Sequence, residues 1–283
     1  MIPCNFVYCR PDTLDEAAQA YLHYSAKTGG AFYYAGGSEV ITMSRTGSIA
    51  PAAVIDIKGI AECRMIEKNP DELVIGAANT LSHIDESRLF PLLGLACGRV
   101  ADHTNQCRIT LGGNLSGTIR YREASLPLLL ADARATLYSR QGLRTVPFCE
   151  VFNGKMTYWP GEFLVCIHVP SRMLKLPHAH IKKTANEKID YPLLSVAALI
   201  AEGKLRVAFS GLYQYPFRSI EVEDALNDAM MPPEDRVGKA VGLLPNIASD
   251  RQGGAPYRAF VLANTLKNIL DAWENGELEK NGC

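Results

Sequence analysis

Two Gly-Gly pairs in separate parts of the chain constrain its fold most. The pair at 36–37 directly follows the β-type run 31–34, and the pair at 112–113 lies in the segment 108–117 among hydroxyl and amide side chains. Adjacent glycines let the backbone turn sharply and let a ligand approach the peptide N–H groups. Successive N–H groups form a concavity that suits a pyrophosphate. A single pair is usually an ordinary turn after a strand, but two pairs favour a dinucleotide diphosphate held from two sides.

Other chemical motifs are missing from the sequence. Neither Gly-Gly pair has the spacing of a Rossmann or P-loop nucleotide site. The eight cysteines are scattered without the spacing of a zinc or iron–sulfur site, so we expect free thiols. No pattern of Ser, His, Asp or Cys indicates nucleophilic catalysis. His178 and His180 share one face of an expected strand without a third ligand nearby, which favours a solvated strand edge over a metal site.

Length and charge narrow the class of protein. The chain has 283 residues, which corresponds to one large domain or two moderate ones. Its 29 Lys and Arg residues balance its 30 Asp and Glu residues, so nothing indicates a nucleic acid or an anionic membrane as partner. No apolar stretch is long enough to span a bilayer, and the first residues do not resemble a signal peptide. We therefore expect a cytoplasmic protein.

Strand and helix patterns alternate along the chain, which predicts an α+β fold. Thr13, with Glu16 three residues later, predicts a helix start. Further helices are expected over 84–100, over 126–133 and in most of the chain after Glu221. Proline ends a strand at residue 170, where we place a domain boundary. The expected strands are 31–34, 53–57, 72–76, 135–138, 144–146, 163–170, 180–182, 194–201 and 205–212.

The chain resembles the FAD-binding subunits of molybdenum hydroxylases of the xanthine dehydrogenase and carbon monoxide dehydrogenase type. Ala35–Glu39 is similar to the family's Ala-Gly-Gly-Thr/Ser-Asp/Glu loop. Thr110–Leu115 is similar to its Thr-Ile-Gly-Gly-Asn-Leu/Ile loop. The resemblance covers nearly the whole chain, because further matching stretches follow in the family's order. These are residues 54–57, 75–82, 130–133 and 208–218.

The resemblance implies a fold, a domain division and a cofactor. The fold is the bilobal FAD-binding fold of p-cresol methylhydroxylase-type flavoproteins with a C-terminal α+β domain. The FAD-binding domain would cover residues 1–170, in lobes of about 1–57 and 58–170, and the C-terminal domain would cover 171–283. No catalytic side chain and no metal ligand of the chain itself is implied.

The resemblance also implies the residues that hold FAD. The first loop would bind the diphosphate, and the second would contact the diphosphate and the ribityl chain. Glu123, nine positions after Asn114, would hold ribityl hydroxyls. The backbone of Leu164 would contact the flavin ring, and Lys182, eight positions before Asp190, would approach its pyrimidine edge. The predicted FAD-binding residues are Ala35, Gly36, Gly37, Ser38, Glu39, Thr110, Gly112, Gly113, Asn114, Glu123, Leu164 and Lys182.

Two stretches depart from the family pattern, and both bear on flavin affinity. The entry to the second Gly-Gly pair, 108–110, is two residues shorter than the family's Arg-Asn-x-Gly-Thr. Residues 119–123 replace the family's Ser-Pro-Ala-x-Asp with a bulkier, more basic stretch. Arg120 and Arg122 would either bind phosphate or pair with Glu123 and nearby acids. Pairing is favoured, because arginine–carboxylate pairs are the commoner outcome.

The function that the resemblance implies is electron transfer inside a larger enzyme. Electrons would pass from a partner's iron–sulfur clusters through FAD to NAD or another acceptor. The partners would be a molybdenum-cofactor subunit and a [2Fe-2S] subunit. Two alternatives stay open: a degenerate scaffold subunit without flavin, and a stand-alone flavin oxidoreductase. The sequence does not specify the hydroxylated substrate, since its pocket would lie on another chain.

Overall fold

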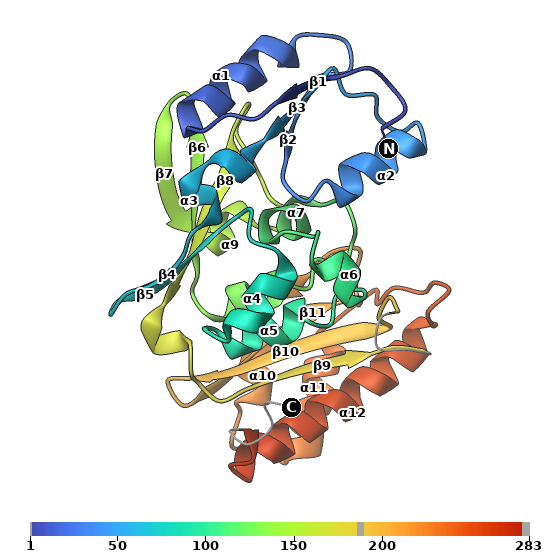
Figure 1. Cartoon of the computed structure of the whole chain (residues 1–283). Helices are drawn as coiled ribbons and strands as arrows, with labels where there is room; N and C mark the ends of the chain where they lie inside the picture. Colours follow the sequence, from blue (N-terminus) through green and yellow to red (C-terminus); the bar gives the residue numbers. More distant parts are fainter. Residues whose placement is uncertain (1, 186–189, 279–283) are drawn as a thin grey trace. The chain divides into compact units, whose positions relative to one another are not determined.

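The computed structural model describes residues 2–185 and 190–278 (Figure 1). The chain forms two compact units, and both contain helices and strands. Because unit 2 includes two segments from before residue 170, compact packing does not follow the linear order of the chain, and the division at 170 stays a prediction. Unit 1 consists of Met1–Ile84, His103–Gly117 and Ala133–Ser171, and unit 2 consists of Asp85–Asp102, Thr118–Asp132 and Arg172–Cys283.

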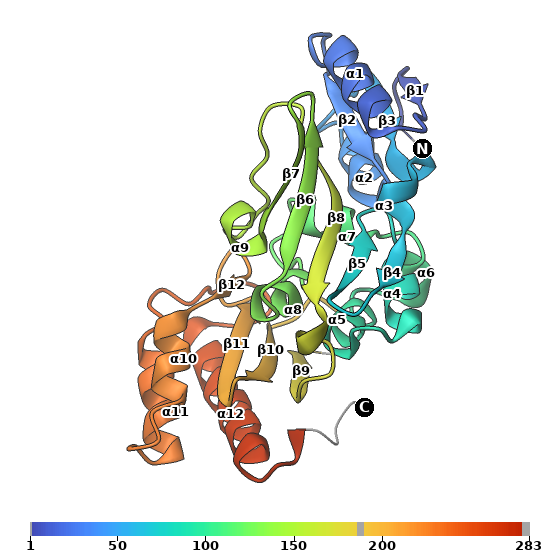
Figure 2. The same cartoon turned by 90° about the vertical axis from the view of Figure 1, so that its left-hand side faces the viewer.

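Unit 1 contains two sheets. The first is parallel, with strand order β1-β3-β2, and its strands are β1 (Val7–Cys9), β2 (Ala31–Tyr34) and β3 (Ala53–Asp56). The second is antiparallel, with order β4-β5-β8-β6-β7 (Figure 2). Its strands are β4 (Ile66–Lys68), β5 (Glu72–Gly76), β6 (Arg134–Ser139), β7 (Gly142–Pro147) and β8 (Phe163–Pro170).

Helix α1 (Leu14–Ser25) of unit 1 begins where its capping residues predict. The Thr13 hydroxyl accepts a hydrogen bond from the Glu16 amide at 3.2 Å, which satisfies one of the free N–H groups of the first turn. Buried residues of α1 pack in one apolar cluster with β3 and β8. The other helical segments of unit 1 are α2 (Ser38–Arg45), the 3₁₀ turn Ile57–Gly59, α3 (Ala61–Arg64), α6 (His103–Gln106), α7 (Leu111–Ser116) and α9 (Phe148–Val151).

Unit 2 is built on an antiparallel sheet of order β12-β11-β10-β9, and α10 to α12 share its main apolar core with β10 and β11 (Figure 2). Glu202 and Gly203 join β10 to β11 with φ of 55° and 71°, a tight hairpin turn in the short gap between the expected strands 194–201 and 205–212. The strands are β9 (His178–Lys183), β10 (Leu194–Ala201), β11 (Lys204–Ser210) and β12 (Phe217–Arg218). The helical segments are α5 (Pro91–Cys97), α8 (Ser125–Leu130), the 3₁₀ turn Ser171–Met173, α10 (Ile220–Leu226), α11 (Pro233–Gly242) and α12 (Ala255–Glu274).

The structure corrects the prediction of one continuous helix over 84–100. Helix α4 (Leu81–Ser87) ends before Arg88, whose φ is 52°, and α5 begins at Pro91. Proline lacks the N–H that would continue the helix and clashes with the preceding turn, but it suits the first helical position. In the part of the chain that the structure describes, no helix combines the length and apolar character needed to cross a membrane.

Candidate functional site

The first glycine segment, residues 34–39, connects β2 to α2. Gly37 caps α2 with a left-handed backbone (φ 70°), and no side chain caps the helix there. The first N–H groups of an uncapped helix attract anions, because the helix dipole places partial positive charge at this end. Ser38 and Glu39 are the first two residues of α2. This geometry suits a phosphate at the end of β2.

The second glycine segment, residues 108–117, lies against the first within unit 1. A Cβ atom on Gly36 would overlap the carbonyl oxygen of Arg108. A Cβ atom on Gly117 would lie 2.6 Å from Oε2 of Glu39. The two segments that the sequence singles out are therefore neighbours in space, as a diphosphate held from two sides requires.

The second segment contains a short helix where the sequence suggested a loop. Thr110 caps α7, and its Oγ1 accepts a hydrogen bond from the Gly113 amide at 3.2 Å. The Gly112 amide donates to the Ala77 carbonyl at 2.8 Å, and a Cβ on Gly112 would lie 2.9 Å from that of Ala77. These two amides already have acceptors, whereas no side chain caps the start of α2. Asn114 is buried in the same helix.

Lys58 is a residue near the first segment that sequence reasoning missed. Its ammonium donates to the Ala35 carbonyl at 2.7 Å and to both carboxylate oxygens of Asp56 at 2.8 and 2.7 Å. The Tyr8 hydroxyl donates to Asp56 Oδ2 at 2.6 Å. β2 and β3 are parallel, with Tyr34 opposite Asp56, so both strands end at the same edge. The charged pair at the end of β3, Asp56 and Lys58, was the signal that could have identified Lys58.

Glu123 and Lys182, both predicted to bind FAD, lie together in unit 2. Their side chains are 4% and 5% exposed, and Lys182 Nζ lies 3.5 Å from Glu123 Oε2. Ser195 Oγ donates to Glu123 Oε1 at 2.5 Å, and Lys182 Nζ donates to the Arg99 carbonyl at 2.5 Å. The Arg99 guanidinium donates to the carbonyl oxygen of His180. We call Arg99, Glu123, His180, Lys182 and Ser195 the buried polar cluster.

Burial and charge act in opposite directions on Glu123. Burial raises the pKa of its carboxyl above the ordinary value, while Lys182, the Ser195 hydroxyl and Arg99 lower it. A buried carboxylate is costly unless it is paired and hydrogen-bonded. The cluster supplies both kinds of partner to Glu123.

Of two expectations about charged residues, one is confirmed and one is wrong. Arg120 pairs with a carboxylate, as the favoured alternative predicts, and the partner in the structure is Asp250, at 2.5 Å, in place of Glu123. Burial opposes ionisation of Asp250, but hydrogen bonds from Arg120, the Gln252 amide and Arg258 outweigh it and lower the pKa of Asp250 to about 2. His180 does not lie at a solvated edge: it is only 5% exposed, since its face of β9 is covered within unit 2.

Leu164 occupies the second position of β8, where it is buried opposite Leu137. The backbone irregularity between Thr136 and Leu137 falls at this point of the sheet. The predicted residues therefore divide into two groups. Leu164 and the residues of both glycine segments lie in unit 1, and Glu123 and Lys182 lie in unit 2.

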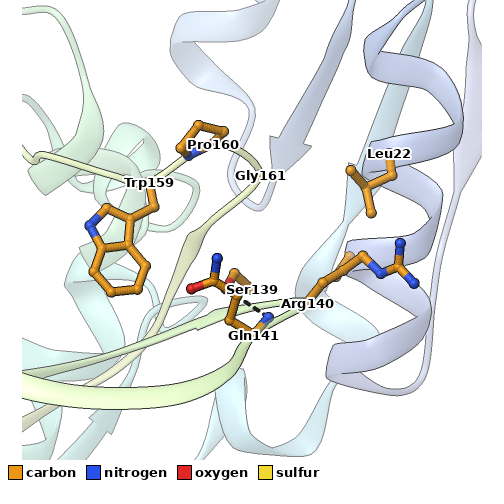
Figure 3. Close-up of a pocket in the computed structure, with 8 residues that line it drawn as sticks. Leu22, Ser139, Arg140, Gln141, Trp159, Pro160 and Gly161 are labelled. Carbon is orange, nitrogen blue, oxygen red and sulfur yellow. Dashed lines mark hydrogen bonds between the residues drawn. The ribbon is translucent and has the colours of Figure 1, made fainter.

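A separate surface pocket of about 380 Å³ lies in unit 1 (Figure 3). Arg140 and Trp159 contribute a charged and an aromatic side chain to it. None of its lining residues belongs to either glycine segment or to the buried polar cluster. They are Ala18, Leu22, Ser139, Arg140, Gln141, Trp159, Pro160 and Gly161.

Comparison with known proteins gives a consistent family. The family model described as the FAD binding domain in molybdopterin dehydrogenase matches residues 4–172, more than half of the chain. The glyceraldehyde dehydrogenase medium chain of Sulfolobus acidocaldarius is 28% identical over 93% of this chain and 96% of that protein. The xanthine dehydrogenase FAD-binding subunit of Escherichia coli O157:H7 is 25% identical over 83% and 86%. The carbon monoxide dehydrogenase medium chain of Afipia carboxidovorans is 25% identical over 96% and 97%.

Solved structures show the same fold. Quinoline 2-oxidoreductase from Pseudomonas putida 86 matches with a TM-score of 0.83 and 22% identity, over 98% of this chain and 99% of that one. Carbon monoxide dehydrogenase from Hydrogenophaga pseudoflava matches with a TM-score of 0.83 and 24% identity, over 97% and 99%. The chain, with its mixture of helices and sheets, therefore has the same fold as these solved structures.

The fold and the paired glycine segments define a flavoprotein subunit. The chain belongs to the FAD-binding subunits of the molybdenum hydroxylase family, which includes the xanthine and carbon monoxide dehydrogenases. It is thus an oxidoreductase component whose cofactor is FAD. The residues present fit this cofactor on two counts: the two glycine segments are in contact, and α2 begins without a side-chain cap.

Proposed function

We propose that this chain is the electron-transfer subunit of a multi-subunit molybdenum hydroxylase. Bound FAD would take up electrons from a partner's iron–sulfur clusters and release them as a pair to NAD or another acceptor. The partners would be a molybdenum-cofactor subunit and a [2Fe-2S] subunit. The main support for the proposal is the contact between the two glycine segments in unit 1 of a chain that belongs to this family. We also propose a cytoplasmic location, in keeping with the free cysteines of the described residues.

The proposed roles of the residues follow from their places. Ala35 to Glu39 would receive the diphosphate at the start of α2, with Lys58 holding the Ala35 carbonyl. Thr110, Gly112, Gly113 and Asn114 would support that loop from α7. Leu164 would offer its backbone to the ring. The same proposal includes these roles, the division at residue 170 and the p-cresol methylhydroxylase-type arrangement of lobes.

The proposed roles in unit 2 belong to Glu123 and Lys182. The Glu123 carboxylate would accept hydrogen bonds from ribityl hydroxyls. The Lys182 ammonium would lie near the pyrimidine edge, where a cation stabilises negative charge gained on reduction. Because Glu123 and Lys182 are already paired, the two roles are coupled.

The test of the proposed function uses the FAD-loaded chain with and without partner subunits encoded beside it. A heterocyclic substrate such as a purine should bleach the flavin absorbance only when the molybdenum and iron–sulfur subunits are both present. Addition of NAD or a dye acceptor should then restore the absorbance. Robust substrate oxidation by the chain alone would contradict the proposal and indicate a stand-alone oxidoreductase. A chain that joins the partners without binding FAD would indicate a scaffold.

Lys182→Met is expected to lower the midpoint potential of the bound flavin. The variant removes a cation that favours the reduced form, and each tenfold loss of that preference corresponds to about 30 mV for a two-electron couple. Lys183→Met is the matched control, because Lys183 is the exposed next residue on the other face of β9. Spectroelectrochemical titration of both variants measures the shift. Equal potentials in the two variants would refute the proposed place of Lys182.

A further inference from the structure

We propose that Arg99, His180 and Ser195 are positioning residues of the cofactor site, which hold the Lys182 ammonium and the Glu123 carboxylate in place. This inference rests on the proposed roles of Lys182 and Glu123. None of the three residues stands in either glycine segment, and the motifs in the sequence did not single them out for flavin binding. Their assignment comes from the contacts within unit 2.

His180 and Arg99 form the first half of this support. Alternate residues of a strand point to the same face, so His180 and Lys182 lie on one face of β9. The Arg99 guanidinium donates to the His180 carbonyl oxygen and also approaches Nδ1 of its ring at 3.3 Å. The carbonyl of Arg99 in turn accepts from Lys182 Nζ at 2.5 Å. His180 thus anchors the segment after α5, and that segment holds the ammonium.

The imidazole of His180 can accept the second of these contacts, from Arg99 to Nδ1, only while the ring is neutral. A guanidinium has only donors, so Nδ1 must be the acceptor and the ring proton must sit on Nε2. Burial, reinforced by the positive charges of Arg99 and Lys182, lowers the pKa of His180 to about 3. Glu123 is the carboxylate of the same cluster, and it contacts Lys182. His180 is therefore neutral and keeps its acceptor at pH 7.

Ser195 forms the second half of the support. It lies opposite Lys182 in the β9–β10 ladder and is fully buried. Its hydroxyl donates to Oε1 of Glu123, while Lys182 approaches Oε2. The two donors contact different oxygens of the carboxyl group and so fix its orientation. They also favour its ionised form.

The energetics favour a functional role for this cluster over a purely structural one. A buried ion pair is weak evidence for stability, because desolvation of the charges offsets their attraction, and apolar residues of similar volume are often as stable. The region offers apolar neighbours for such a core, since Ala197 and Leu199, on the same face of β10 as Ser195, are buried. A polar ligand that binds these charged groups would explain why this face of the sheet is polar.

The experiment compares conservative with disruptive variants in the full-length, FAD-loaded chain. Ser195→Ala and His180→Phe remove the hydrogen-bonding group, whereas Ser195→Thr and His180→Gln retain a donor and a neutral acceptor. We expect the disruptive variants to raise the Kd for FAD about tenfold and to make the flavin potential more negative, and the conservative variants to recover most of both. Fluorescence titration with FAD and spectroelectrochemistry measure the effects. Folded disruptive variants with unchanged Kd and potential would overturn the inference.

A second measurement on the unmodified chain covers the case in which the variants fail to fold. Nitrogen-15 NMR of the histidines should show His180 as a neutral ring protonated at Nε2. This ring should not titrate between pH 8 and about 5, although the ordinary pKa of histidine, about 6.5, lies inside that range. A His180 that titrates near its ordinary pKa would overturn the inference. Failure of the proposed function looks different: FAD would bind, respond to these variants as expected, and yet exchange no electrons with the partner subunits.

Discussion

Lys182→Met is expected to destabilise the folded chain by about 3–5 kcal/mol, because it leaves the buried Glu123 carboxyl without its cation. Glu123→Gln should also destabilise the chain, since it leaves Lys182 as a buried ammonium without a carboxylate. The double variant removes both charges and should recover a large part of the loss. Urea unfolding of the apoprotein at pH 7 measures the free energies of all three.

The dependence of this effect on pH has a definite sign. Burial already raises the pKa of Glu123, and loss of Lys182 removes an opposing influence and raises it further. A carboxyl whose folded pKa lies above its unfolded value favours folding at low pH, and this contribution is lost as pH rises through the folded pKa. The Lys182→Met variant should therefore be more strongly destabilised, relative to the unmodified chain, at pH 8 than at pH 5.

The control for this cycle is Lys183→Met, the exposed neighbour of Lys182, which should change stability by no more than about 0.5 kcal/mol. Residues in contact give non-additive effects, whereas independent residues give additive ones. Strictly additive losses for Lys182→Met and Glu123→Gln would show that the two side chains do not form a pair.

Gly37→Ala is expected to weaken FAD binding about tenfold or more, which corresponds to about 1.4 kcal/mol of binding free energy. Gly37 has a φ of 70° at the start of α2, and a Cβ there would collide with the ring of Tyr34. The displaced ring and the new methyl group would both alter the place where the diphosphate is proposed to meet the helix.

Gly47 provides a matched control just beyond the other end of α2. Its φ is 76°, so alanine meets the same left-handed backbone, but a Cβ there would lie in open space. Each alanine should cost about 1–2 kcal/mol of stability from the backbone alone. Calorimetric titration with FAD distinguishes the two variants, because only the Gly37 variant should lose affinity for FAD. Equal affinities in the two variants would argue against a diphosphate at the start of α2.

Local elements could be read from the sequence because their causes are local. The Thr13 cap, the turn at 202–203 and the strand 163–170 all appear where residue type and spacing predict them. Pro91 shows the limit of pattern reading: the apolar periodicity of 84–100 suggested one helix, although the proline already contained the reason for the break.

The sequence by itself determined the family, the FAD cofactor and the strand and helix character of most segments, because motif identity and periodicity are properties of neighbouring residues. Only the tertiary structure decided which charged groups meet. Lys58 donates to the Ala35 carbonyl, Arg120 pairs with Asp250, and Lys182 pairs with Glu123. The last two pairs join residues far apart in the chain, so they form only when the packing of the sheet and helices brings their side chains together. This pairing matters for stability, because a buried charge without a partner costs several kcal/mol.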